Sequence, residues 1–261
     1  MHAFRVVMLA IAILAALFIV LPLLSMGWYT TFGDLASTFT NPAVDLSIYL
    51  TMLSGGLAAL VCVLIGVPAG YYLARTSGLA TKLLGSVLEL PIMIPHFVVG
   101  IALLLFAPFI FQSLIGVVAV MVFVGLSYTV KAAESSFVEL GDGYEKAAQT
   151  LGSSPMKAFF SVVFPMSARP IAGGALLSWA RGISEMGAFL VLAYFVSPIS
   201  PILPAATNPM SIYAYQVYQL YGVRGAATVS IVYVLVAMAV FVAAKYANGW
   251  KEIFVRYSVG E

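Results

Sequence analysis

The chain has 261 residues, of which 62% are hydrophobic and only 8% are charged, and its mean hydropathy is +1.06. A soluble domain carries about 25% charged residues, so this composition excludes an ordinary soluble domain and is typical of a membrane protein with several spans. The formal net charge of +2 says less than the positions of the basic residues do. The single cysteine, Cys62, lies in an apolar run, which excludes a disulfide or a cysteine-based metal site within one chain.

The N-terminal segment, Met1 to Trp28, has the composition of a signal peptide but not its length. Its apolar run exceeds the roughly 7–15 residues of a signal peptide's apolar region, and no small-x-small cleavage pattern ends it. We therefore interpret the segment as a first membrane helix that is retained.

Six stretches of the chain are long and apolar enough to cross a bilayer, which takes about 20 apolar residues. The third and fourth are separated only by the region of Pro108, which predicts a tight hairpin there. We predict an all-α membrane protein with one membrane domain over residues 1–261. The predicted spans are Phe4–Met26, Ile48–Ala74, Leu83–Phe106, Phe109–Val130, Ile171–Val196 and Ala226–Ala244.

The basic residues predict the orientation, because cytoplasmic loops of membrane proteins carry an excess of Lys and Arg. With the N-terminus inside, Arg224 alone falls outside, Arg181 falls within a span, and the other ten basic residues are cytoplasmic. This predicts cytoplasmic N- and C-termini and a cytoplasmic loop over about residues 131–169. The ten residues are Arg5, Arg75, Lys82, Lys131, Lys146, Lys157, Arg169, Lys245, Lys251 and Arg256.

The predicted outer loop, Ser197–Gly225, is rich first in proline and then in tyrosine. Tyrosines at this depth form an interfacial aromatic belt in many membrane proteins. The alternative is a short amphipathic helix that plugs the outer mouth of a channel or meets an external partner.

The longest polar run, Glu145–Pro165, predicts a helix, a sharp turn and a second short helix closed by Phe-Pro. Gly152 is able to adopt a positive φ in the turn, and Pro155 suits a first helical turn. Two short helices on the surface of a membrane protein favour a docking site for a partner.

The sequence lacks the motifs of several catalytic sites. It contains no GxxxxGK[ST] phosphate loop, no G-x-S-x-G elbow and no H-E-x-x-H pair. The two histidines, His2 and His96, lie on different segments. We therefore expect no catalysis, no metal site and no cofactor in this chain alone.

The fifth span carries the ionisable residues Arg181 and Glu185, four apart and so on one helix face. Arg181 lies about 16 Å from the start of the span at 1.5 Å rise per residue. Such a residue costs about 2.5–3.5 kcal/mol unless it is paired or lines a hydrated cavity. An ion pair that makes burial tolerable and a pair that lines a pathway are both open, and nearby Ser178 and Ser184 suit helices packed around a narrow pore.

The third span contains Pro91 and Pro95, four residues apart, followed by His96 and Gly100. Two prolines bend or unwind a helix and free backbone carbonyls. Broken helices of this kind are tolerated where protein covers them or where they line a cavity. His96 is then either a proton or anion contact or a hydrogen-bonded packing residue. These four residues join Ser178, Arg181, Ser184 and Glu185 as candidates for a translocation path or gate.

The polar run also resembles the EAA loop of binding-protein-dependent ABC importer permeases. That loop reads Glu-Ala-Ala, a glycine after three further residues, and Ile-x-Leu-Pro after nine more. The sequence departs from it where Lys146 stands in place of Glu, with Glu145 one residue earlier, and where Val162 and Phe164 replace Ile and Leu. The matching residues are Ala147, Ala148, Gly152 and Pro165.

The resemblance extends to the molybdate/tungstate importer permeases, and related sulfate permeases carry similar stretches. The stretches that carry it are Leu90–Leu104, Ala147–Ser167 and Ser178–Tyr194. It implies the ATPase-docking residues Glu145, Lys146, Ala147, Ala148, Leu151, Gly152, Pro155, Lys157, Phe164 and Pro165.

The resemblance further implies a homodimer of six-helix subunits in the lipid of the cell membrane. Two cytoplasmic ATPase subunits would bind ATP and Mg²⁺ and hold the coupling loops, and an external binding protein would deliver the oxyanion. No nucleic acid is implied as a partner.

Three alternatives stay open. A sulfate or thiosulfate importer subunit is similar in sequence. An intramembrane enzyme would need a nucleophile with a base or a metal cluster, which the sequence lacks. A proton-driven carrier would be expected to show inverted repeats and several intramembrane carboxylates, whereas only Glu185 is deep.

Overall fold

The computed structural model describes residues 2–247, with side chains from residue 4 onward. The predicted cytoplasmic C-terminus, with Lys251 and Arg256, lies outside the described residues. The longer helices are α1 (His2–Ser25), α3 (Pro42–Arg75), α4 (Leu79–Met93), α5 (His96–Phe106), α6 (Leu114–Leu140), α9 (Phe164–Ile183) and α11 (Met210–Ala247). Short helical segments connect them: η1 (Met26–Tyr29), α2 (Phe32–Phe39), η2 (Pro108–Ile110), α7 (Gly143–Thr150), α8 (Pro155–Ala158), the π-helical turn η3 (Phe159–Val163) and α10 (Gly187–Leu192).

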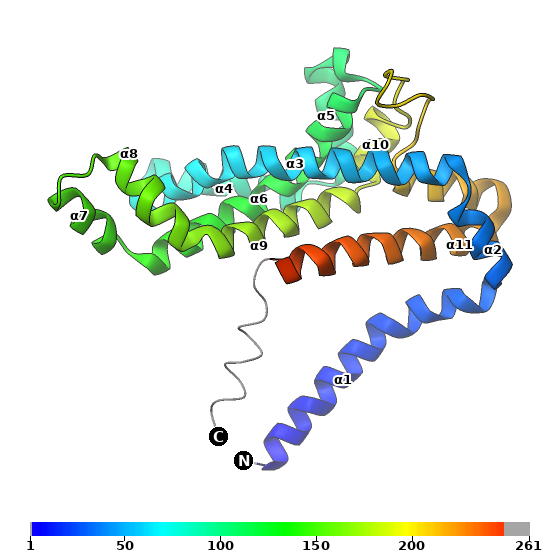
Figure 1. The fold of residues 1–261 in the computed structure, drawn as a ribbon, viewed down its shortest axis with the longest axis horizontal. Helices are drawn as coiled ribbons and strands as arrows, with labels where there is room; N and C mark the ends of the chain where they lie inside the picture. The colour runs from blue at the N-terminus through cyan, green and yellow to red at the C-terminus, as the bar shows by residue number, and fades with distance from the viewer. Residues whose placement is uncertain (1, 248–261) are drawn as a thin grey trace.

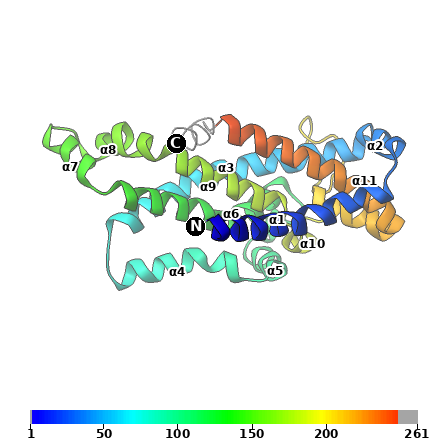
Figure 2. The same ribbon diagram turned by 90° about the horizontal axis from the view of Figure 1, so that it is seen from below.

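Four long helices, α3, α6, α9 and α11, run side by side as a bundle (Figure 1). Helices α7 and α8 project beyond one end of the bundle, which we call the α7/α8 end, and α2 lies at the other end. Helix α5 turns away from the bundle axis and stands beside α10. Figure 2 shows α4 and α5 along one edge of the bundle.

The predicted membrane class and number of spans are confirmed. Five helical segments of the described chain are long and apolar enough to cross a membrane, and a sixth span is obtained if the bent pair α4 and α5 counts as one. Helix α1 differs from the others, because its most apolar window has a hydropathy of 3.1 and is 0% buried. It diverges from the bundle (Figure 1) and so presents its whole surface to lipid or to another chain.

Small residues allow α3 and α6 to approach closely. A Cβ atom at Gly70 would lie 2.8 Å from Ala133 Cβ and 2.8 Å from two backbone atoms of α6. Gly66, one turn earlier on the same face, lies against Thr129 in the same way. Close contact through small residues is a major source of helix association in membranes, where the hydrophobic effect between helices is weak.

Hydrogen bonds then fix α3 to α11 near the α2 end. Ser47 Oγ and Tyr233 Oη lie 2.6 Å apart, and both residues are buried. Thr51 Oγ1 accepts a hydrogen bond of 2.9 Å from the backbone N–H of Met210, the first residue of α11. The side chain of Thr51 thereby satisfies one of the unpaired N–H groups at the start of that helix.

The predicted fourth span, Phe109–Val130, is wrong at both ends, because the helix α6 runs from Leu114 to Leu140. Pro108 begins the short turn η2 instead, and the side chain of Ser113 accepts a hydrogen bond of 3.0 Å from the N–H of Gly116. This cap fixes the true start of the helix.

The fifth and sixth spans also differ from the prediction. Helix α9 begins at Phe164 and ends at Ile183, so Ile171–Val196 is not one helix, and α10 follows as a separate segment. Helix α11 begins at Met210, within the predicted outer loop, and is interrupted at Gly222, whose φ of 68° and ψ of −162° are not helical. The second half of the predicted outer loop, Ser197–Gly225, is therefore helical. This agrees with the alternative prediction of a short helix in that loop.

We expect Gly70→Ala to lower the free energy of unfolding by about 1–3 kcal/mol, because the added methyl group overlaps the backbone of α6. Thermal unfolding in detergent measures the effect. Gly56→Ala is the matched control on the same helix, since no atom lies within 4 Å of the position of its Cβ. Equal unfolding temperatures for the two variants would contradict this account of the helix contact.

Candidate functional site

The polar run forms the predicted helix–turn–helix at the α7/α8 end. Helix α7 is followed by Gly152, whose φ is +93°, and Pro155 is the first residue of α8. The N–H of Gly152 bonds to the carbonyl of Gln149 at 2.9 Å, and the N–H of Ser153 bonds to that of Ala148 at 3.0 Å. A glycine with positive φ after a helix end, with such reversed bonds, is a common helix stop.

The second helix does not end at Phe164 and Pro165 as predicted. It passes through the π-helical turn η3 into α9, so that one helical run extends from Pro155 to Ile183. A proline inside an α-helix clashes with the carbonyl four residues earlier, here that of Ser161. The wider π-helical turn lies at this point in the chain, which explains how Pro165 is accommodated without a helix end.

The turn exposes large apolar side chains. Leu151 is 88% exposed and Met156 is 72% exposed, and Phe160 is exposed one helical turn after Met156. Lys146 and Lys157 lie among them and are exposed. The sequence reasoning included Leu151 but missed Met156 and Phe160, although their spacing of four residues places them on one helix face. Of the other predicted docking residues, Ala147, Gly152, Pro155 and Pro165 are exposed, and Ala148 and Phe164 are partly buried.

Glu145 does not lie on this exposed surface, although it was predicted to dock the ATPase. It is 8% exposed and faces α3, where the hydroxyl of Tyr71 donates a hydrogen bond of 2.5 Å to Glu145 Oε1. Arg75 Nε lies 3.4 Å from Glu145 Oε2. The neighbouring Lys146 is exposed, and its Nζ lies 2.5 Å from Asp142 Oδ2. The hydrogen bond between them holds the pKa of Asp142 below its usual range.

A second polar site forms where two helix breaks meet inside the bundle. The chain bends by 113° between α4 and α5, directly before His96, and it leaves α9 just before Glu185. His96 Nδ1 lies 2.7 Å from Glu185 Oε2, and Arg181 Nη2 lies 3.0 Å from the same oxygen. Arg181 Nη1 also reaches Ser184 Oγ at 3.2 Å. We call His96, Arg181, Ser184 and Glu185 the polar cluster.

Glu185 connects four helical segments, three through its carboxylate and one through its backbone carbonyl. The expected pair with Arg181 forms, but across the end of α9 and not along one helix, because α9 ends at Ile183. Glu185 Oε1 accepts a hydrogen bond of 2.9 Å from the N–H of Ala188 in α10. Ser211 of α11 donates to the backbone carbonyl of Glu185. With only 1% of its side chain exposed, the carboxylate is buried but fully paired.

Two of the predicted path residues lie in contacts between helices. Ser178 is 3% exposed and donates a hydrogen bond of 2.6 Å to the carbonyl of Gly125 in α6. Gly100 packs α5 onto α10, since a Cβ there would lie 2.7 Å from the carbonyl oxygen of Ala188. Pro91 lies within α4, and Pro95 directly precedes α5 at the bend.

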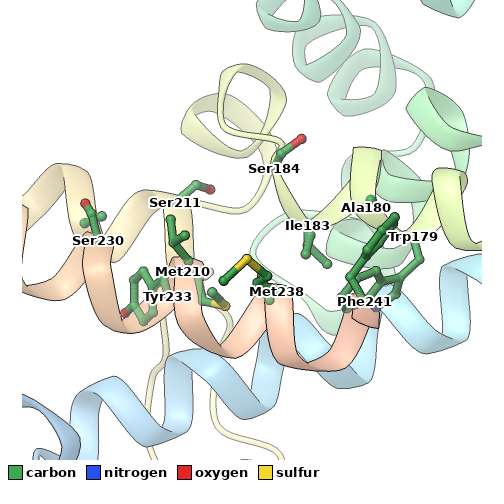
Figure 3. Close-up of a pocket in the computed structure, with 13 residues that line it drawn as sticks. Trp179, Ala180, Ile183, Ser184, Met210, Ser211, Ser230, Tyr233, Met238 and Phe241 are labelled. Atoms are coloured by element: carbon green, nitrogen blue, oxygen red, sulfur yellow. The ribbon is translucent and has the colours of Figure 1, made fainter. Parts of the chain in front are cut away.

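A hollow of about 480 Å³ lies between α9 and α11 (Figure 3). Trp179 and Phe241 lie close together at one end of it, and Ser184 of the polar cluster lies at its edge. Its lining is almost entirely apolar and contains no basic side chain. A dianion would lose its hydration there without compensation, so the hollow does not suit an oxyanion. Within residues 2–247, no group of three or more His, Cys, Asp or Glu residues is arranged to hold a metal ion.

Comparison with known protein families matches residues 66–250 to the family described as the binding-protein-dependent transport system inner membrane component. The chain is 39% identical over 165 residues to the molybdate/tungstate transport system permease protein WtpB of Pyrococcus abyssi, covering 63% of this chain and 66% of that protein. The match thus spans just under two thirds of that relative. With WtpB of Pyrococcus furiosus the identity is 34% over 216 residues, or 82% of each chain.

A more distant relative is the sulfate transport system permease protein CysT of Salmonella typhimurium, 28% identical over 168 residues, which is 59% of this chain and 61% of that protein. Among solved structures, the fold is similar to a chain of a bacterial ABC transporter involved in the import of the acidic polysaccharide alginate. The TM-score is 0.70 at 13% identity, with 94% of each chain covered. At this identity the likeness concerns the fold alone.

Arg181→Ala should lower the free energy of unfolding by about 3 kcal/mol, because it removes one partner of a buried carboxylate. The double variant Arg181→Ala/Glu185→Gln should recover part of this loss, since no charge is then left buried. Lys131→Ala serves as the control, because Lys131 forms half-exposed ion pairs with Glu134 and Glu89, each of which contributes at most about 1 kcal/mol. Chemical unfolding in detergent measures the stability of each variant. A double variant no more stable than Arg181→Ala would refute this account of the buried carboxylate.

Proposed function

The chain belongs to the family of binding-protein-dependent transport system inner membrane components, and from this premise we propose that it imports a small oxyanion, molybdate or tungstate. In this proposal it is the transmembrane subunit of an ATP-driven importer. Both WtpB relatives are named as molybdate/tungstate permeases, which supports these two ions as the substrate. The relative from Pyrococcus furiosus is the stronger support, because its 34% identity extends over 82% of each chain.

Two ATPase subunits that bind ATP and Mg²⁺ would dock on the surface around Leu151, Met156 and Phe160. A surface of exposed apolar side chains on a polar loop is typical of a protein interface. The neighbouring Lys157 adds positive charge for acidic side chains of a partner, whereas the charge of Lys146 is balanced by Asp142. The loop itself is well ordered by its own hydrogen bonds, so docking need not first fold it.

The α7/α8 end would face the cytoplasm and the α2 end the outside of the cell membrane. The distribution of Lys and Arg along the sequence supports this orientation. An external binding protein would deliver the oxyanion to the α2 end. In this proposal ATP is hydrolysed on the cytoplasmic side of the membrane and the oxyanion is captured on the outer side.

A second copy of the chain would complete the path along an open face of α9. Residues along this face are exposed or partly exposed, three of them are small, and no atom lies within 4 Å of the Cβ position at Gly173. Small residues suit close contact with a second helix better than contact with lipid. The apolar hollow within one chain does not suit a dianion, which also favours a route between two copies. The face consists of Met166, Pro170, Gly173, Leu177, Ala180 and Ser184.

Arg181 would be the cation nearest this route. Its side chain is 22% exposed, and Glu185 balances its charge. Conduction needs an attraction that is strong enough for the ion to enter and weak enough for it to leave. A paired arginine meets both requirements better than an unpaired one, which would hold a dianion tightly.

Sulfate is the second candidate substrate, and the similarity to CysT supports it. Molybdate, tungstate and sulfate are tetrahedral dianions that differ mainly in size. In liposomes that contain the complete complex, we expect excess tungstate, but not excess sulfate, to suppress uptake of labelled molybdate. Suppression by sulfate alone would assign the chain to sulfate import.

Gly152→Arg should abolish the stimulation of ATP hydrolysis by loaded binding protein while the spans remain folded. A residue other than glycine is strained at φ +93°, and the long side chain projects from the proposed docking surface. Gly143→Ala is the control, since its added methyl group meets no atom within 4 Å and its φ is not positive. Stimulated hydrolysis at the normal rate in Gly152→Arg would refute docking at this turn.

A further inference from the structure

Arg75, the last residue of α3, binds three groups at the α7/α8 end. Its Nη1 donates a hydrogen bond of 2.8 Å to the carbonyl of Phe137, and its Nη2 donates one of 2.7 Å to the carbonyl of Gly141. Its Nε donates to Glu145 Oε2 at 3.4 Å. One guanidinium therefore joins the end of α3 to the end of α6 and to α7.

Two of the three contacts supply hydrogen-bond donors to unpaired carbonyl groups at the end of α6. The last four carbonyls of a helix lack partners within the helix, and a cation there also interacts favourably with the helix dipole. Phe137 contributes one of these carbonyls, and Gly141 directly follows the helix. The planar guanidinium donates in several directions at once, which a lysine ammonium on a flexible stem does not reproduce.

Tyr71 completes this arrangement one turn earlier on α3. Its hydroxyl holds the second oxygen of the Glu145 carboxylate at 2.5 Å. Its ring lies edge to face against Phe137, with 5.5 Å between centroids, and against Phe159, with 4.9 Å. We call Tyr71, Arg75, Phe137, Gly141 and Glu145 the Arg75 junction. It ties α7, α6 and the π-helical turn to one helix.

That helix, α3, extends from the junction to the neighbourhood of the polar cluster. With 34 residues it is about 50 Å long at 1.5 Å rise per residue. Gly55 lies in the first half of α3, and a Cβ atom there would lie 2.9 Å from the side chains of Trp179 and Ile183. Ile183 is the last residue of α9, beside Ser184 of the polar cluster. A displacement of α3 along its axis therefore acts directly on the end of α9.

We propose that Arg75 is a positioning residue that couples the docking loop to α3. The proposal rests on the proposed function, in which closure of the ATPases moves α7. Covalent connections carry that movement to α6 and α9 alone, because α7 joins α6 through residues 141–142 and α8 runs into α9. The Arg75–Glu145 contact adds α3 as a third element. Glu145 then acts by holding the loop in place and not by touching the ATPase.

The test uses the complete complex of permease, ATPases and binding protein in liposomes, with molybdate as the transported ion. The variants are Arg75→Ala, Arg75→Lys, Glu145→Ala, Glu145→Gln and the double alanine variant. Each is measured for co-purification of the ATPase, for ATP hydrolysis and for molybdate taken up per ATP hydrolysed. Glu139→Gln is the control, because Glu139 is an exposed carboxylate near the end of α6 and outside the junction.

We expect every variant to retain the ATPase, whereas molybdate per ATP falls about fivefold or more in either alanine variant, the size of a typical coupling between sites. The double variant should lose no more than Arg75→Ala, since both changes break one connection. Arg75→Lys should remain low, because one ammonium cannot replace three contacts. Glu139→Gln should behave as the wild type.

Unchanged molybdate per ATP in Arg75→Lys and Glu145→Gln would overturn the proposal, and so would additive losses in the double variant. Loss of ATPase co-purification in Glu145→Gln, with the spans folded, would also overturn it, because Glu145 would then dock the partner. These two conservative variants decide the matter if the alanine variants fail to fold. A wild-type complex without molybdate uptake would refute the proposed function itself.

Discussion

The fold depends on satisfying polar groups where two helices break inside an apolar bundle. Backbone and side-chain polar groups find no water in the hydrocarbon core, so a break is stable only where protein supplies the partners. Here the two breaks meet, and the Glu185 carboxylate binds Arg181, His96 and the first turn of α10. The carboxylate thus adds polar contacts to the apolar packing of α5 on α10.

Local patterns in the sequence predicted much of the fold. The number of spans follows from hydropathy, and the turn at Gly152 and Pro155 follows from the backbone preferences of these two residues. The bend near Pro95 was also foreseeable, since two prolines four residues apart favour a bend or a break in a helix. These features depend on the residues within one segment and not on their neighbours in space.

Other features depend on contacts between distant segments. Glu145 faces inward because Arg75, seventy residues earlier in the chain, lies beside it. The end of α9 at Ile183 interrupts an apolar run that would otherwise continue as a helix, because the carboxylate of Glu185 caps α10 instead. Neither contact can be identified from periodicity, so the inward position of Glu145 and the cap on α10 were missed, whereas the pair of Arg181 with Glu185 was predicted from its spacing. The hydrogen bond of Ser178 was not predicted for the same reason, since Gly125 lies on another helix.

The uninterrupted helical run from Pro155 to Ile183 has a mechanical consequence. An exposed side chain such as Met156 and the buried end near Arg181 belong to one helical run, about 43 Å long measured along the helix at 1.5 Å per residue. A continuous helix can transmit rotation about its axis as well as displacement along it. A partner that rotated the exposed end would therefore also turn the guanidinium of Arg181 about the axis of α9, through the wider turn at Phe159–Val163.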